Sequence, residues 1–290
     1  MKKRKVAKLV TGTATQDGAG VKLTRVLSRP DVKDFDPFLM LDAFDSKNPD
    51  DYTKGFPWHP HRGIETVTYL VEGDIEHGDS MGNKGSINDG CCQWMTAGSG
   101  IIHQEMPKPA PHMLGLQLWI NLPKKDKMTA PAYRDIRSEM IPVIKEDGAV
   151  IRVIAGEYKG KKGATKGDYV KATYLDVKLE SNALWEIDTN PDETVFVYLL
   201  QGDAVFEEES STQYIPAKTA VLMTYGDNMY VKAGDKGARF VLLAAKPLKE
   251  DVAWGGPIVM NTREELQNAF EELDNGTFIK NNHPKNIALK

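Results

Sequence analysis

The sequence predicts an all-β protein built from two tandem β-domains and a short C-terminal helix. Three observations support this prediction. Runs of β-branched and aromatic residues recur along the chain, with glycine and proline between them at short intervals. The two halves of the chain repeat one another weakly, and only the end shows helical periodicity. With 290 residues, the chain is long enough for two domains of ordinary size.

Three runs are the clearest strand candidates. Residues 66–71 read Thr-Val-Thr-Tyr-Leu-Val and lead into a Glu-Gly-Asp turn. Residues 117–122 alternate polar and apolar side chains and then stop at a proline. Residues 193–200 form a third run, which we expect Gly202 and Asp203 to end.

The helical segment spans residues 262–273. Thr262 is a natural N-cap, and Glu265 three residues later completes a capping box. One face of the predicted helix is apolar and carries Leu266, Ala269, Phe270 and Leu273. We expect this face to be buried against a domain.

The internal repeat divides the chain. Residues 69–74 read Tyr-Leu-Val-Glu-Gly-Asp, and residues 198–203 read Tyr-Leu-Leu-Gln-Gly-Asp. Two further matches follow in the same order, which indicates a duplicated β-domain. A polar segment flanked by prolines separates the two copies. We therefore predict an N-terminal domain over residues 1–135 and a C-terminal domain over residues 136–290.

Composition excludes several classes of protein. The formal net charge of −4 argues against a direct nucleic-acid binder, which would carry a basic surface. No apolar run approaches the length of a membrane span, and the basic first residues lead into no apolar signal segment. The two cysteines, Cys91 and Cys92, are adjacent, so we expect free thiols in a reducing compartment. We predict a cytoplasmic protein, or a nuclear one if the source is eukaryotic.

Two short motifs can hold a metal ion. His59 and His61 are two residues apart, as are His103 and Glu105, and residues two apart on a strand point to the same side. Two such pairs on neighbouring strands would surround one point with three imidazoles and a carboxylate. Those donors suit iron, manganese, nickel, copper or zinc. Glu65 shares strand parity with His61, so parity alone allows either Glu65 or Glu105 as the carboxylate ligand.

The second half of the chain cannot build the same site. No histidine occurs between residues 113 and 282. The repeat aligns the candidate ligands with, or close to, Val231, Ala233, Asp188 and Asn190. We therefore expect one metal per chain, held by the first half, and a second half that helps to cover it.

Longer strings make the resemblance to a known family specific. The spacing of the first motif region is similar to the first cupin motif: Gly55, His59, His61, Glu65 and Gly73. Residues 90–103 look like a variant of the second cupin motif. Several further segments resemble the pirin family in particular: residues 36–39, 55–57, 59–63, 93–98, 103–107, 115–119 and 256–262. The resemblance covers nearly the whole chain, with Trp58 and Ile64 as local departures.

The resemblance implies two cupin domains in tandem, each a jelly-roll-type β-barrel, ahead of the C-terminal helix. It implies one metal ion, most typically iron, in the first lobe and none in the second. The ligands carried over are His59, His61, His103 and Glu105. Cupins in general use the glutamate of the first motif, here Glu65, whereas pirins use the one at Glu105. The resemblance therefore selects Glu105 and leaves Glu65 in the wall of the site.

The activity that the resemblance implies is that of a quercetin 2,3-dioxygenase, which opens a flavonol with dioxygen and releases carbon monoxide. The metal would act as a Lewis acid and template, and Glu105 would also accept the flavonol proton. Trp58 beside His59 offers a surface on which a flat flavonol could stack. The alternative is a redox-sensitive regulatory protein that binds a transcription factor or a metabolic enzyme, since both functions need the same ligands.

Five other residues have weaker interpretations. Arg62 could pair with a carboxylate near the metal, bind an anion at the mouth of the site, or lie on the surface. We expect His77 and His112 in loops or on the surface. Cys91 and Cys92 could act as redox thiols, but buried small side chains are the simpler expectation.

Overall fold

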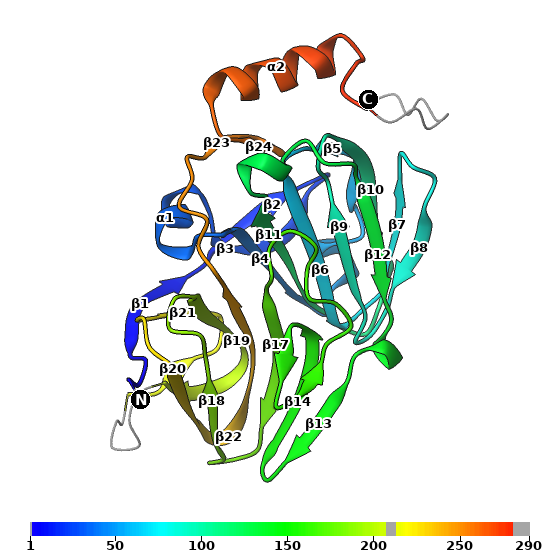
Figure 1. The fold of residues 1–290 in the computed structure, drawn as a ribbon. Helices are drawn as coiled ribbons and strands as arrows, with labels where there is room; N and C mark the ends of the chain where they lie inside the picture. Colours follow the sequence, from blue (N-terminus) through cyan, green and yellow to red (C-terminus); the bar gives the residue numbers. More distant parts are fainter. Residues whose placement is uncertain (1, 207–212, 281–290) are drawn as a thin grey trace. The chain divides into compact units, whose positions relative to one another are not determined.

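A computed structural model describes residues 2–206 and 213–280 of the chain (Figure 1). Contacts divide the chain into two compact units. The histidine unit, as we name it, comprises residues 13–32, 38–138 and the chain from 248 onward. The companion unit comprises the chain up to residue 12 with residues 33–37 and 139–247. Each unit thus takes in a segment from the opposite end of the chain. The predicted boundary between a domain of residues 1–135 and a domain of residues 136–290 describes the two sequence repeats, and it stays a proposal.

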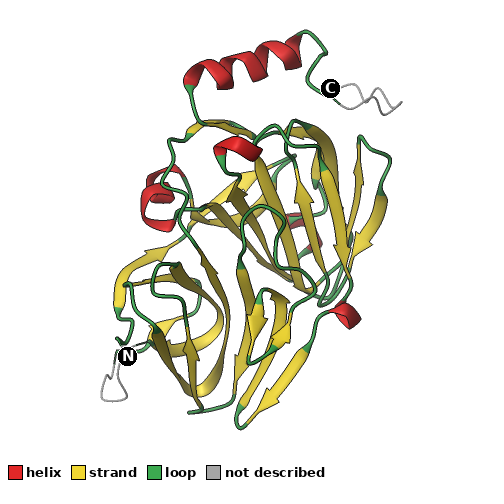
Figure 2. Cartoon of the chain, viewed as in Figure 1, coloured by secondary structure: helices red, strands yellow, loops and turns green. Residues whose placement is uncertain are grey.

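Strands predominate in both units (Figure 2). The histidine unit contains a seven-stranded antiparallel sheet in the order β12-β9-β6-β11-β4-β3-β2 and a four-stranded one in the order β5-β10-β7-β8. The strands of the larger sheet are β2 (Thr13–Asp17), β3 (Val21–Leu27), β4 (Phe38–Ser46), β6 (Ile64–Glu72), β9 (Cys92–Thr96), β11 (Met113–Asn121) and β12 (Ala132–Ile136). Those of the smaller sheet are β5 (Phe56–His61), β7 (Ile75–Asp79), β8 (Lys84–Ile87) and β10 (Ile101–Pro107).

Strand pairing closes no barrel among the described residues, because the strand order of each sheet is an open path. The closed β-barrel that we expected is therefore not present as a hydrogen-bonded ring. Side chains join the two sheets of the histidine unit instead. The Thr68 hydroxyl on β6, for example, donates to the Glu105 carboxylate on β10 at 2.9 Å.

The C-terminal segment of the histidine unit forms a small hairpin and a helix. The hairpin pairs β23 (Ala253–Gly255) with β24 (Ile258–Met260), and the helix is α2 (Arg263–Asp274). The predicted capping box is present, with the Thr262 hydroxyl accepting from the Glu265 backbone N–H at 3.1 Å. Ala269 is fully buried in a cluster with Ile258, Met260 and Phe278. Phe270, expected on the buried face, is 38% exposed.

The companion unit is organised around one nine-stranded sheet. Its main order is β1-β21-β19-β22-β17-β14-β13, with β18 paired to β22 and β20 to β19. The strands are β1 (Val6–Thr11), β13 (Val143–Glu146), β14 (Ala149–Ala155), β17 (Thr173–Leu179), β18 (Leu184–Asp188), β19 (Thr194–Val205), β20 (Ile215–Pro216), β21 (Thr219–Met223) and β22 (Asn228–Ala245). The companion unit also contains β15 (Glu157–Tyr158) and β16 (Lys161–Lys162). The histidine unit contains the 3₁₀ turns η1 (Arg29–Asp31), η2 (Pro49–Asp51) and η3 (Lys124–Asp126), while α1 (Val32–Phe35) and η4 (Ser138–Met140) lie where the chain passes from one unit to the other.

One predicted strand end is wrong. The run that begins near Thr194 continues through Gly202 and Asp203 to Val205. The register against β22 shifts at this point, and Gly202 has a φ of 73°. A bulge with glycine in the left-handed region lets the strand bend without ending.

The interior of the companion unit is apolar where the histidine unit carries its histidines. In the histidine unit β10 pairs with β5, and His103 lies opposite His59. In the companion unit β22 pairs with β18, and Val231 lies opposite Trp185. The position equivalent to His59 is therefore Trp185, three residues before the Asp188 that the repeat suggested. Trp185 and Val231 are both buried in the hydrophobic core.

Among the described residues, no helix is long and apolar enough to cross a membrane.

Candidate metal centre

Two neighbouring strands bring three histidines together. β5 carries His59 and His61 on one side, and β10 runs antiparallel to it with His103 directly opposite His59. One ligand nitrogen from each of the three side chains lies within 4.8 Å of the other two. His61 and His103 are buried and His59 is half-buried. The three imidazoles form one compact group of nitrogen donors, and His59 and His61 line a cavity.

The hydrogen bonds of the His59 and His61 rings leave the Nε2 atom of each ring, here called the inner nitrogen, as an acceptor. His59 Nδ1 lies 2.8 Å from the Pro57 carbonyl oxygen, and His61 Nδ1 lies 3.0 Å from that of Pro257. A carbonyl oxygen only accepts, so each Nδ1 carries the proton and each Nε2 of a neutral ring has a lone pair. Backbone carbonyls commonly orient metal-binding histidines in this way.

The inner nitrogens lack partners that could satisfy them. The Nε2 atoms of His59 and His61 are 3.1 Å apart, a contact that two lone pairs cannot make favourable. His103 Nε2 is buried and forms no hydrogen bond within the described chain. A cation bound to these nitrogens would relieve both conditions, so the residues present fit a metal ion.

Burial keeps the rings in the form that binds metal. Desolvation lowers the pKa of His59 and lowers that of His61 to about 3. Desolvation likewise holds the pKa of His103 well below the usual value, and the neighbouring His59 and His61 lower it further. Neutral imidazoles are the ligand form, so a metal ion has little competition from protons at these three rings.

Glu105 lies near the histidines but outside the group of three. Its Oε1 accepts from the Thr68 hydroxyl at 2.9 Å, and its Oε2 accepts from Gln117 Nε2 at 3.4 Å. Burial raises the pKa of Glu105 to about 7, although the hydrogen bond from Thr68 acts in the opposite direction. Glu105 lines the cavity. Glu65 is fully buried, accepts from the Thr96 hydroxyl at 2.8 Å and is not part of the cavity lining.

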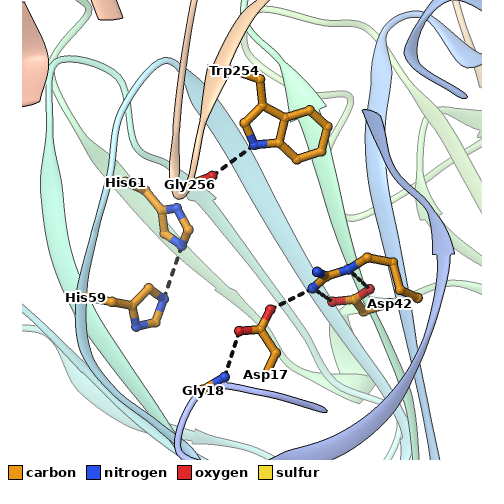
Figure 3. Close-up of polar contacts among 8 residues, drawn as sticks. Asp17, Gly18, Asp42, His59, His61, Trp254 and Gly256 are labelled. Atoms are coloured by element: carbon orange, nitrogen blue, oxygen red, sulfur yellow. Dashed lines mark hydrogen bonds and ion pairs between the residues drawn. The ribbon is translucent and has the colours of Figure 1, made fainter. Parts of the chain in front are cut away.

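A cavity of about 830 Å³ opens from the histidines within the histidine unit. Aromatic walls come from Phe44, Phe56, Trp119 and Trp254. Figure 3 shows the polar side of the cavity, where Asp17 and Asp42 hold one arginine, Arg25. The size and mainly apolar lining are typical of a small-molecule site with a few fixed polar groups.

Comparisons with known proteins place this chain in one family. The Pirin family matches residues 20–120, and the Pirin C-terminal cupin domain matches residues 174–279. The chain belongs to the pirin family. A pirin-like protein of Caulobacter vibrioides is 44% identical over 278 residues, which cover 95% of this chain and 99% of that protein. Human pirin is 40% identical over 276 residues, covering 94% and 93% of the two chains.

A solved structure agrees with these matches. The crystal structure of a quercetin 2,3-dioxygenase from Acinetobacter baumannii superposes with a TM-score of 0.86 at 32% identity, over 95% of this chain and 98% of that chain. The predicted all-β, two-domain cupin fold is therefore confirmed, and the resemblance to pirins is confirmed with it.

The expectations for Trp58, His77 and His112 meet different outcomes in this pirin. Trp58 packs over Gly78 and does not line the cavity, so our expectation that it forms a stacking surface is wrong. Successive residues of a strand point to opposite sides, and Trp58 adjoins His59. His77 is buried on β7, 6% exposed, and its ring meets the Tyr133 hydroxyl, so it is not a surface histidine. His112 lies in the loop before β11, as expected, and its ring nitrogens contact the Glu72 and Asp45 carboxylates at 3.2 and 2.9 Å.

Arg62 is neither a surface residue nor part of the cavity mouth. Its guanidinium is buried, donates to the Ser99 and Phe278 carbonyl oxygens at 2.7 and 2.8 Å, and pairs with Glu272 of α2 at 2.7 Å. Cys92 is buried as expected, Cys91 is half-buried, and both are free thiols.

Sequence reasoning missed two residues of the C-terminal hairpin, Trp254 and Pro257. The segment that contains Pro257 resembles the pirin family, which could have drawn attention to it, but nothing in its composition indicates contact with His61.

Proposed function

We propose that this pirin holds one iron ion on His59, His61, His103 and Glu105 and acts as a quercetin 2,3-dioxygenase. The observation that carries the proposal is the convergence of three imidazole nitrogens within 4.8 Å of one another, with His59 and His61 in the lining of a mainly apolar 830 Å³ cavity. The related quercetin 2,3-dioxygenase structure supports the reaction class. Manganese, nickel, copper or zinc would use the same donors.

The fourth ligand in this proposal is Glu105. It lines the cavity and Glu65 does not. The bulge between His103 and Glu105 changes the register of β10 against β5, so that Glu105 lies opposite Phe56. Thr68 and Gln117 hold the two carboxylate oxygens from the larger sheet. These contacts fix the carboxylate at the cavity wall beside the histidines.

A bound iron ion would supply a Lewis acid and a template on which dioxygen and a flavonol oxygen meet. The chain supplies the rest. The aromatic walls exclude water and accept the flat rings of a flavonol. Glu105 lines the cavity, and its carboxylate would take the proton of the flavonol 3-hydroxyl when its bond to the metal loosens. The flavonol and dioxygen together give the ring-opened ester and carbon monoxide.

The test is metal analysis of the purified protein followed by a flavonol assay. We expect about one iron per chain, a spectral change on adding quercetin without air, and steady bleaching of the flavonol band when air is admitted. His61→Ala should abolish the bleaching. His112→Ala is the matched control, since His112 lies outside the cavity, and it should leave the rate unchanged. Equal turnover in wild type and His61→Ala would refute the proposal.

The regulatory alternative predicts a different result from the same preparation. A redox-sensitive binding protein would take up metal and could bind quercetin without turnover, while a protein partner would bind only one oxidation state. Absence of oxygen-dependent bleaching in the iron-loaded protein would therefore favour this second function.

A further inference from the structure

A row of side chains in contact with one another, three aromatic rings and one guanidinium, runs along one wall of the cavity and begins at His61. Trp119 stands edge-on to His61, with ring centroids 5.0 Å apart and an interplanar angle of 83°. Trp254 packs against Trp119 at 5.7 Å. The guanidinium carbon of Arg29 lies over the Trp254 ring at 5.6 Å. All four residues line the cavity.

Trp254 is fixed in this row by its own hairpin. Its indole N–H donates to the Gly256 carbonyl oxygen at 2.9 Å, as Figure 3 shows. The ring therefore needs no polar partner from a ligand and offers its apolar surface to the cavity. A flat ligand whose inner end lies at His61 would extend its outer ring along Trp119 and Trp254.

The two arginines of the cavity differ in charge compensation. Arg25 makes a two-point contact with Asp42, at 3.0 and 2.8 Å, and pairs with Asp17 at 2.6 Å. Asp17 is also held by the Gly18 backbone N–H at 2.7 Å. These three groups hold one another by ion pairs, and with both carboxylates ionised they carry a net charge of −1, so they offer an anionic ligand no attraction.

Arg29 has no such partner. Its side chain is exposed, and within the described chain it forms no ion pair and no hydrogen bond, only the contact with Trp254. The outer end of the row therefore carries a positive charge that no carboxylate of the described chain contacts, next to an aromatic surface. Guanidinium groups recognise carboxylate, sulfonate and similar oxyanions through paired N–H donors.

We propose that Arg29 and Trp254 form a recognition subsite for an anionic group on the outer ring of a flat aromatic substrate. The proposal rests on the dioxygenase function proposed above, because it assumes that the inner end of the substrate lies at the histidines. It makes Arg29 and Trp254 specificity-determining residues, distinct from the metal ligands.

The experiment compares quercetin with quercetin 5′-sulfonate, which carries the anion on its outer ring. Binding to the iron-loaded full chain is measured by calorimetry without air, at low salt. We expect the sulfonate to bind roughly two- to fivefold more tightly, as for an exposed ion pair, with the preference lost at high salt. Arg29→Gln should bring the ratio of affinities to about one without weakening quercetin itself. Trp254→Leu should weaken both ligands.

Arg263→Gln is the matched control, because Arg263 is an exposed arginine on α2 outside the cavity. It should leave the preference intact. Equal binding of the two flavonols to the wild type, or an unchanged preference in Arg29→Gln, overturns the subsite. Oxygen-dependent turnover is measured separately. Turnover without a preference removes only the subsite, a preference without turnover removes only the dioxygenase activity, and failure of both flavonols to bind removes both proposals.

Discussion

Replacing Glu105 with glutamine should have opposite effects on the metal-free and the metal-loaded protein. Burial raises the pKa of this carboxyl group from an ordinary 4.5 to about 7. At about 1.4 kcal/mol for each pKa unit, the ionised carboxylate costs the folded metal-free protein on the order of 3 kcal/mol. Glutamine has nearly the same shape and no charge. Rotation of the Gln117 amide would preserve the hydrogen bonds around it.

The pH dependence follows from the direction of the pKa change. Below pH 4.5 the carboxyl group is protonated in both the folded and the unfolded chain. Between pH 4.5 and about 7 only the unfolded chain releases the proton, so the stability of the metal-free wild type falls as pH rises. The stability gained by Glu105→Gln should therefore be small at pH 5 and reach about 3 kcal/mol at pH 8. The histidine contributions are common to both variants and cancel in the difference.

The assay is urea unfolding of the chelator-treated variants at both pH values, together with metal titration of each. Loss of a ligand should weaken metal binding on the order of 100-fold or more. Glu65→Gln is the control and should keep its metal, since Glu65 does not line the cavity. A less stable metal-free Glu105→Gln at pH 8 would show that the carboxylate is a structural partner of Thr68 and Gln117. Unchanged metal binding would refute its role as a ligand.

Three further outcomes are expected. Metal affinity should fall as pH drops below about 7, where Glu105 gains its proton, and Glu105→Gln should flatten that part of a competition titration. Lys127→Met should destabilise the protein more at pH 9 than at pH 7, by about 2 kcal/mol in urea melts, because burial lowers the pKa of the amino group that donates to the Gly63 and Val259 carbonyls and the Asn121 side chain at 2.7–2.9 Å to about 7. A chain that ends at residue 250 should retain no tightly bound iron by elemental analysis, since it lacks the Pro257 carbonyl that orients His61; full retention would contradict this.

Local patterns predicted most of the strands because each strand carries its own signal. Residues 66–71 lie within β6, residues 117–121 of the run 117–122 lie within β11, and the capping box of α2 is present as expected. The continuation of β19 through Gly202 was not predictable in this way. A glycine followed by a polar residue favours a turn locally, and only pairing with β22 makes it a bulge.

The candidate site was predictable to the extent that it depends on strand parity. Parity places His59 and His61 on one side of β5, and the same parity places Trp58 on the other side. Our expectation that Trp58 stacks on a substrate neglected this. The aromatic surface that the cavity does have includes Trp254, nearly 200 residues along the chain, and no local pattern links that residue to the histidines.

The C-terminal segment makes the metal centre a property of the whole chain. The Pro257 carbonyl sets the tautomer of His61, the Val259 backbone N–H donates to the Arg62 carbonyl at 3.1 Å, and Lys127 joins the Gly63 and Val259 carbonyls. The candidate ligand His61 and the two residues after it, Arg62 and Gly63, are thus held by the β23–β24 hairpin. The chain reaches this hairpin only after it has passed through the companion unit. The histidines of the first half are the candidate donors, but the orientation of His61 depends on the last part of the described chain. Selection for metal binding at this site would therefore act on both ends of the chain, although only one half contains the candidate ligands.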